Sequence, residues 1–273
     1  MNIKKEDHLP REGKRGMPKA IRRGYAPTDE KDFSPQKLKL LCSAQQDIFY
    51  LLCRGYGLER AVTFVGDRFQ FSARQRMALA RATCSRKELL SRREKERTRD
   101  FCGAALLIDG FNVIIPLEIA LSDSTLIRCM DETLRDLAGL HGSYRLICQT
   151  DAAIGMIGRE LTAMRIAEAT FILDAPVSNA GRLRQRILGL LQSCPFRAKA
   201  VLSDHADGML YGKHLVATGD SVILDRCGSW VNLVARILED SSLSCHHVID
   251  LSLPGALGGQ DENSGACPLA SGK

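Results

Sequence analysis

The stretch Ala104-Ala105-Leu106-Leu107-Ile108-Asp109-Gly110-Phe111-Asn112-Val113 decides the fold. Its first five residues are apolar, which is the right length for a β-strand that is buried on both faces. The run ends at Asp109, and the glycine after it tolerates the positive φ of a tight turn. Because ligands of open α/β sheets bind outside the carboxyl ends of the strands, Asp109 is expected to face a binding site. An Asp109 that only forms a turn remains the alternative here.

Later apolar runs have the same character, and helical patterns alternate with them. We predict further strands at residues 169–174, 198–204, 215–220 and 247–251. Helices are predicted between them, at 124–138, at 150–166 and from a cap at Ser178 or Asn179 to about residue 192. This alternation is typical of parallel βαβ units, so residues 101–252 are predicted to form an α/β domain with a central parallel sheet.

Several of the predicted strands end on a carboxylate. The strand-end residues are Asp109, Asp174, Asp204 and Asp220, and Asp225 follows about one helical turn after the last. Because parallel strands end at one edge of a sheet, several of these charges should lie close together, at a cost that Mg²⁺ or Mn²⁺ relieves. Such an ion activates water and holds a phosphate. The alternative is that each Asp forms a turn or caps a helix. For a single Asp this alternative is favoured, whereas for Asp109, Asp174 and Asp220 together metal binding is favoured.

Charge divides the chain into a basic and an acidic part. Residues 1–100 contain 24 Lys and Arg against 13 Asp and Glu, a net charge of +11, and residues 101–273 contain 14 against 19, a net charge of −5. A basic segment next to an acidic one suggests that the first attracts phosphate and the second binds metal. A solvated basic surface without a partner is the alternative.

The basic part is predicted to consist of an arm and a helical module. Residues 1–33 are polar and rich in Pro and Gly, which predicts a flexible basic arm. Residues 34–100 are predicted to be a small basic helical module, because Ser34-Pro35 begins an apolar helical pattern and Ser72-Ala73-Arg74-Gln75 resembles a capping box. We expect the α/β domain to fold without this module. Residues 253–273 are predicted to be a disordered tail.

Other classes of function lack their sequence signals. No Gly-x-Gly-x-x-Gly follows the first strand, and the chain contains neither a P-loop nor a Gly-x-Ser-x-Gly motif. Ten cysteines are present without a Cys-x-x-Cys pair, which favours a reducing cytoplasm. No apolar run approaches the roughly 20 residues that span a bilayer. We therefore expect a cytoplasmic protein without a membrane partner.

Two motifs resemble a known class of nuclease domain. Ile108-Asp109-Gly110-Phe111-Asn112-Val113 and Ala217-Thr218-Gly219-Asp220-Ser221 look like the first and last acidic motifs of PIN-like domains, especially the NYN branch. Over about residues 35–252 the chain is similar to an uncharacterised prokaryotic family, domain of unknown function four-three-four. That family joins a basic N-terminal module to a PIN-like domain, so the resemblance implies a three-layer PIN-like fold behind a small basic α-helical domain.

The resemblance also implies an activity and a set of metal ligands. PIN-like domains are generally Mg²⁺- or Mn²⁺-dependent nucleases, often acting on RNA. On that pattern Asp109 and Asp220 would be metal ligands, and Asp174 or Asp225 would complete the site. This chain departs from the pattern at Val222, where a further acid is usual, and the next acid is Asp225. An altered or inactive site therefore remains an alternative.

Polar residues near the acids are candidates for binding the substrate. Asn112 and Asn179 are suited to orient water or phosphate oxygens, although both also suit turns and caps. Arg182 and Arg186 lie four residues apart on one predicted helix and share a face that can hold a phosphate. A solvated helix face is the alternative for these arginines.

The sequence thus predicts a Mg²⁺- or Mn²⁺-dependent ribonuclease. Its catalytic residues are predicted to be Asp109, Asp174, Asp220 and Asp225, with RNA as partner and the basic module contributing affinity. A non-catalytic RNA-binding or regulatory protein with a degenerate site is the main alternative, and a nucleotide-binding protein is a third hypothesis. A homo-oligomer and a protein partner for the basic module both stay open.

Overall fold

The computed structural model describes residues 22–139, 142–240 and 247–253. Its centre is a parallel sheet of five strands in the order β5-β4-β1-β6-β7. These strands are β1 (Ala105–Asp109), β4 (Glu168–Asp174), β5 (Arg197–Ser203), β6 (Val216–Ala217) and β7 (Trp230–Val231). The opening apolar stretch is therefore the central strand, which confirms an α/β fold around a parallel sheet.

Helices cover both faces of this sheet. Leu106 and Ile108 of β1 point into a core formed with α6 (Gly110–Leu121), α7 (Cys148–Ala163), α8 (Ala180–Leu191) and α11 (Leu233–Asp240). Leu107, on the opposite face, packs against the core of α9 (Ala206–Leu210) and α10 (Ser221–Arg226). Alternate residues of β1 thus point to opposite faces, and the sheet forms the middle one of three layers, with helices on each side.

The strand order creates a switch point beside β1. The chain passes from β1 to β4 and β5 on one side and then returns to β6 on the other side of β1. Ile108 of β1 is in register with Phe171 of β4 and with Ala217 of β6. In such sheets the crevice between the diverging connections, at the carboxyl ends of the strands, is the usual binding site.

Residues 124–138 do not form the predicted helix. They contain β2 (Leu126–Arg128) and β3 (Leu134–Asp136), which pair antiparallel, and β8 (Val248–Asp250) joins β2 in a second sheet of order β3-β2-β8. Leu126 is buried in the main core and Ile127 in a second core on the other side. Burial of successive residues on opposite sides requires a strand, so tertiary packing overrides the helical pattern.

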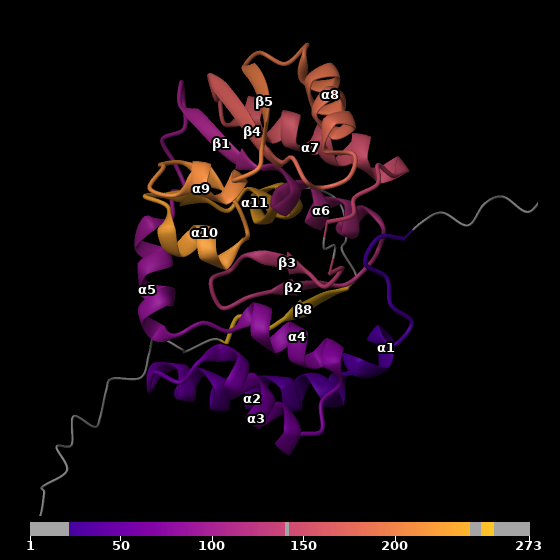
Figure 1. Ribbon diagram of the computed structural model, residues 1–273, viewed down its shortest axis with the longest axis vertical. Coiled ribbons are helices and arrows are strands. Elements are labelled where there is room, and N and C mark those ends of the chain that lie inside the picture. The colour runs from indigo at the N-terminus through magenta and orange to yellow at the C-terminus, as the bar shows by residue number, and fades with distance from the viewer. Residues whose placement is uncertain (1–21, 140–141, 241–246, 254–273) are drawn as a thin grey trace, which may run out of the picture.

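The basic module is helical, as predicted. Its helices are α2 (Pro35–Cys53), α3 (Leu58–Arg68), α4 (Ala73–Ala82) and α5 (Arg86–Lys95). The predicted capping box at Ser72 and Gln75 is present. Figure 1 shows α2, α3 and α4 beneath the three-stranded sheet, and the five-stranded sheet above it.

This module shares its core with the rest of the chain. Ile127, Cys129, Leu137, Ile249 and Leu251 are buried in the same cluster as the apolar residues of α2, α3 and α4. Removal of residues 1–100 would therefore expose one face of β2, β3 and β8 to water. The expectation that the α/β domain folds without the module is not supported by this packing.

Residues 22–33, the described part of the predicted flexible arm, have a defined structure. Residues 22–33 include α1 (Asp29–Asp32) and lie across the α/β domain. Arg23 pairs with the fully buried Glu118 of α6 at 2.8 Å and lies over the ring of Tyr144. Asp29 accepts hydrogen bonds from Arg74 and from Thr125. The rest of the predicted arm, residues 1–21, and the predicted tail beyond residue 253 lie outside the described residues.

Within residues 22–139, 142–240 and 247–253, no helix combines the length and the apolar character that a membrane crossing requires.

Candidate functional site: an acidic cleft at the edge of the sheet

Asp109 is a buried carboxylate at the carboxyl end of β1. Its side chain makes no capping hydrogen bond to α6, so the alternative of a simple helix cap does not hold. Instead Oδ2 accepts hydrogen bonds from the Asn112 amide at 2.8 Å and from the Thr218 hydroxyl at 2.7 Å. Gly110 lets the start of α6 lie close to β4, since a Cβ at this position would clash with the side chain of Leu173.

The surroundings of Asp109 disfavour its ionised form. Burial is the largest cause and raises its pKa from the ordinary 3.8 to about 7, and the charges of Asp220 and Asp207 act in the same direction. The hydrogen bonds from Thr218 and Asn112 oppose this rise without cancelling it. A carboxyl group that titrates near neutral pH beside other acids is typical of functional sites.

Asp220 enters the cleft from the opposite side of the switch point. It follows β6, and its Oδ1 caps α10 by accepting hydrogen bonds from the backbone N–H groups of Val222 and Ile223 at 2.8 and 3.1 Å. Thr218 joins the two acids, because it donates to Asp109 and accepts from the backbone N–H of Asp220. The turn after β6 thereby fixes both carboxylates relative to each other.

Two more carboxylates complete the acidic cluster, which we define as Asp109, Asp174, Asp207 and Asp220. Partial burial and then the charge of Asp207 raise the pKa of Asp174, which ends β4. Asp207 is exposed near the start of α9, and desolvation by its neighbours and then the charge of Asp220 raise its pKa. Asp109 and Asp174 end strands, Asp207 and Asp220 lie where helices begin after strands, and each of the four acids interacts electrostatically with at least one other.

Asp207 takes the place that the sequence suggested for Asp204. β5 ends at Ser203, and Asp204 is exposed in the turn that follows it. Three residues later, α9 directs Asp207 toward the cluster, where its charge acts on Asp109 and Asp174. Asp207 lies in the first turn of the helix that follows β5, and this position is the signal by which the sequence could have identified it.

A basic side chain from the N-terminal module lies across the cleft. Arg81, near the end of α4, lines two adjoining cavities of about 270 and 200 Å³ together with Asn112 and Asp136. The first cavity reaches Asp220, and the second reaches Asp174. About a third of the Arg81 side chain is exposed, and it pairs with Asp136 at 3.5 Å. The sequence shows Arg81 only as one of several arginines on a helix, so its place depends on packing.

A buried ionic network supports the loop that carries Asp220. Arg135 donates to the carbonyl oxygen of Gly219 at 2.6 Å and to Asp131 at 2.6 Å. Arg92 of α5 donates to Asp131 at 2.7 Å and to both oxygens of Asp225 at 2.8 and 2.9 Å. Burial alone would raise the pKa of Asp131, but Arg135 and Arg92 outweigh it and hold that pKa below its ordinary value.

Four of the residues predicted for the site lie elsewhere. Asp225 faces Arg92, on the side of α10 toward α5, and the structure does not bring it to the acidic cluster. Arg186 pairs with Asp151, and Arg182 is exposed on the same helix, α8. Asn179 donates to the carbonyl oxygen of Tyr144. Of the predicted substrate-binding residues, Asn112 lines the cleft.

The acidic cluster fits a hydrated hard cation and not a closed cage. Among the residues that the structure describes, no three His, Cys, Asp or Glu side chains converge closely enough to hold a metal ion. The donors present are carboxylate oxygens, which suit Mg²⁺ and Mn²⁺. Mg²⁺ usually retains several waters and takes one or two carboxylates together with substrate phosphate. Asp109 and Asp220 are the two acids that Thr218 joins, and Asp207 acts electrostatically on both Asp109 and Asp174.

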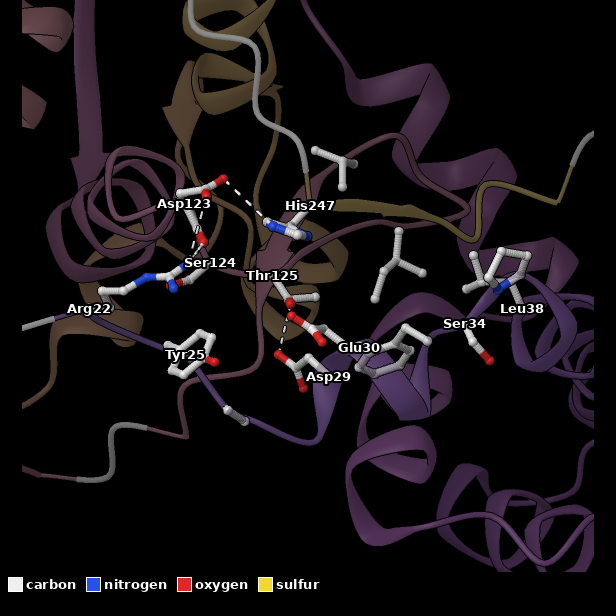
Figure 2. Close-up of a pocket in the computed structure, with 15 residues that line it drawn as sticks. Arg22, Tyr25, Asp29, Glu30, Ser34, Leu38, Asp123, Ser124, Thr125 and His247 are labelled. Carbon is white, nitrogen blue, oxygen red and sulfur yellow. Dashed lines mark hydrogen bonds and ion pairs between the residues drawn. The ribbon is translucent and has the colours of Figure 1, made fainter.

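Another cavity, of about 550 Å³, lies where residues 22–33 meet β8 and the loop before β2. Figure 2 shows Arg22 and His247 directed at Asp123, and Asp29 directed at Thr125. These polar groups satisfy one another, at 3.7 Å for Arg22 to Asp123 and 2.7 Å for Thr125 to Asp29. We therefore place the candidate site at the acidic cleft.

Two family models match the chain, and the boundary between the two matches lies near the end of α5. Residues 98–236 match the family described as "Domain of unknown function (DUF5616)", and residues 40–95 match "Protein of unknown function (DUF434)". An uncharacterized protein of Methanocaldococcus jannaschii is 33% identical over 199 residues, which cover 72% of this chain and 95% of that protein. No solved structure matches the chain significantly. The resemblance to domain of unknown function four-three-four is thus confirmed for residues 40–95.

Proposed function

The chain belongs to the family described as "Domain of unknown function (DUF5616)", and for this member we propose a metal-dependent nuclease that hydrolyses phosphodiester bonds in RNA. The observation that supports the proposal is the acidic cluster at the switch point of the sheet, with Arg81 across the cleft. We propose that the α/β fold is of the PIN-like type, as the motifs at Asp109 and Asp220 suggest.

The charges of the cleft suit a phosphodiester with a divalent cation. Four carboxylates alone would repel a phosphate, and repulsion between neighbouring acids adds to the desolvation that raises the pKa values of Asp109, Asp174 and Asp207. A bound Mg²⁺ or Mn²⁺ would supply positive charge, polarise the phosphate and acidify a water molecule. Arg81 is suited to hold a non-bridging phosphate oxygen from the opposite wall.

Asp109 is a residue that we propose to hold the cation. Both of its hydrogen bonds from the described residues go to Oδ2, so Oδ1 is the oxygen that remains for water or a cation. Asn112 and Thr218 orient this carboxyl group, and Asp220 is proposed to hold the cation with its Oδ2 while Oδ1 caps α10.

The test is a cleavage assay with matched carboxylate variants. We expect wild type to cut single-stranded RNA in Mn²⁺ or Mg²⁺ but not in EDTA, and Asp109→Asn to reduce the rate at least 100-fold. Asp220→Asn should act similarly without unfolding α10, because Asn caps helices as well as Asp. Asp204→Asn removes a neighbouring exposed acid outside the cluster and is the control.

Absence of cleavage in both metals, or equal losses for Asp109→Asn and Asp204→Asn, would contradict the nuclease proposal. The second candidate would then be a non-catalytic RNA-binding protein. Two observations favour it: no three side chains already converge on a metal position among the described residues, and Val222 stands where a further acid is usual. That candidate predicts RNA binding that is the same in Mn²⁺ and in EDTA.

A further inference from the structure

A third cavity, of about 320 Å³, adjoins the acidic cleft on the side of the N-terminal module. Its walls come from the loop between α2 and α3, the end of α4, the start of α5 and α10. It shares four lining residues with the 270 Å³ cavity that reaches Asp220, namely Ala80, Arg81, Arg135 and Ser221. A chain that lies across the acidic cleft would therefore meet this cavity next.

The inner wall of this cavity is lined by arginines. Arg92 and Arg135 are almost fully buried and are held in place by Asp131, while Arg81 is partly exposed. Asp225 and Glu88 also line the cavity and offset part of this charge, so it is not simply a cationic patch. Of these three arginines, Arg81 has the most exposed guanidinium and is therefore the one that an incoming phosphate can reach.

A buried hydroxyl group on the same wall lacks a partner. Thr83 lines the cavity, is only 5% exposed, and its Oγ1 has no hydrogen-bond partner among the described residues. Buried hydroxyl groups are normally satisfied, so an unsatisfied one needs an explanation such as a missing water or ligand.

The outer wall carries an exposed aromatic ring. Tyr56 is 60% exposed and stands between Gly55 and Gly57 in the loop that joins α2 to α3. Gly55 has φ +85°, a conformation that favours glycine and turns the chain sharply at this point. An exposed ring near a partly exposed guanidinium such as that of Arg81 is a combination by which proteins hold single-stranded nucleic acid, with the base on the ring and a phosphate at the cation.

We propose that this cavity is a nucleotide subsite for a single-stranded RNA that extends from the acidic cleft. One nucleotide next to the scissile phosphate would stack its base on Tyr56 and place a phosphate at Arg81. The inference rests on the proposed function and deepens it, because it names single-stranded RNA as the substrate and gives the N-terminal module a direct role in binding it. A cavity of this size accommodates one unpaired nucleotide.

The experiment measures binding separately from cleavage. All variants are made in an Asp109→Asn background, and fluorescence anisotropy gives the Kd for an eight-nucleotide single-stranded RNA at fixed salt. Tyr56→Ala is expected to weaken binding by about 5- to 140-fold, the range for loss of one stacked base. Tyr56→Phe should keep wild-type affinity, because it keeps the ring. Arg81→Gln should weaken binding and reduce the slope of log Kd against log salt by about one phosphate contact.

Tyr50→Ala is the matched control for Tyr56→Ala. Tyr50 is 58% exposed on α2, next to Arg54, and does not line the cavity. It should change the Kd less than twofold, and circular dichroism should show that all variants remain folded. Equal effects at Tyr50 and Tyr56, no effect at Tyr56, or equal competition by a perfect RNA duplex would overturn the subsite.

The two proposals fail in distinguishable ways. If wild type cleaves RNA while Tyr56→Ala binds normally, the nuclease stands and the subsite is wrong. If Tyr56→Ala loses affinity while wild type cleaves nothing, the subsite stands and the nuclease is wrong. If wild type does not bind the single-stranded RNA measurably, the subsite is overturned.

Discussion

Replacing Asp109 by Asn should stabilise the protein in metal-free buffer, and increasingly so as the pH rises. The folded state holds the Asp109 proton more tightly than the unfolded chain, since its pKa is raised from 3.8 to about 7. Between these two values the unfolded chain ionises first, so wild-type stability falls as the pH rises through this window. Asn has the same size, can still accept the hydrogen bonds from Asn112 and Thr218, and carries no charge.

The size of the effect follows from the pKa difference. About three units at 1.36 kcal/mol each place the full penalty near 4 kcal/mol above pH 7. About 1.6 kcal/mol of this is already present at pH 5, so the advantage of Asp109→Asn should grow by about 3 kcal/mol between pH 5 and pH 8. At roughly 2 to 4 °C per kcal/mol, the difference in melting temperature should widen by about 6 to 12 °C.

The assay is thermal unfolding followed by circular dichroism, in EDTA, at pH 5, 6, 7 and 8. Asp204→Asn is the control, and its effect on the melting temperature should stay flat over this range because Asp204 is exposed. A melting temperature of Asp109→Asn that falls below wild type at pH 8, or a difference that does not change with pH, would refute the reasoning. Addition of Mn²⁺ should raise the melting temperature of wild type more than that of the variant.

Two further predictions concern the framework of the cleft. Asp131→Asn leaves Arg92 and Arg135 without their shared buried carboxylate and should lower the free energy of unfolding by about 3 to 5 kcal/mol, measured by urea denaturation; a loss below about 1 kcal/mol would contradict it. Removal of residues 1–96 should yield a chain that does not fold cooperatively, because the face of β2, β3 and β8 loses its cover; a sharp thermal transition of the truncated protein would show that the module is separable.

The parts of the fold that the sequence predicted are those with short-range signals. β1 and β4 are mainly apolar because helices cover both of their faces, and three of the four acids in the cluster were found because they end or follow predicted strands. The hairpin of β2 and β3 was missed because one face of it packs on the main core and the other on the N-terminal module. No local pattern reveals that a segment lies between two cores.

The residues that the sequence missed or misplaced depend on contacts distant in the chain. Asp225 was predicted as a site residue because it follows a strand end by about one helical turn. In the structure it binds Arg92, 133 positions earlier in the chain, and faces away from the cluster. Arg81 reaches the cleft only because α4 packs beside β2 and β3. Asp207 belongs to a helix of five residues, which is too short to give a periodic pattern.

The N-terminal module has a more specific role than its net charge suggests. A basic segment that only attracted RNA would need no fixed position, yet Arg92 of α5 and Lys95 bind the last turn of α10, and Arg135 fixes Gly219 at the start of the same loop. Asp220 lies between these two anchor points, so displacement of α5 would also displace an acid of the cluster. The module thus holds the loop that carries Asp220 and places Arg81 opposite the carboxylates, and a change in its packing would alter the geometry of the cleft itself.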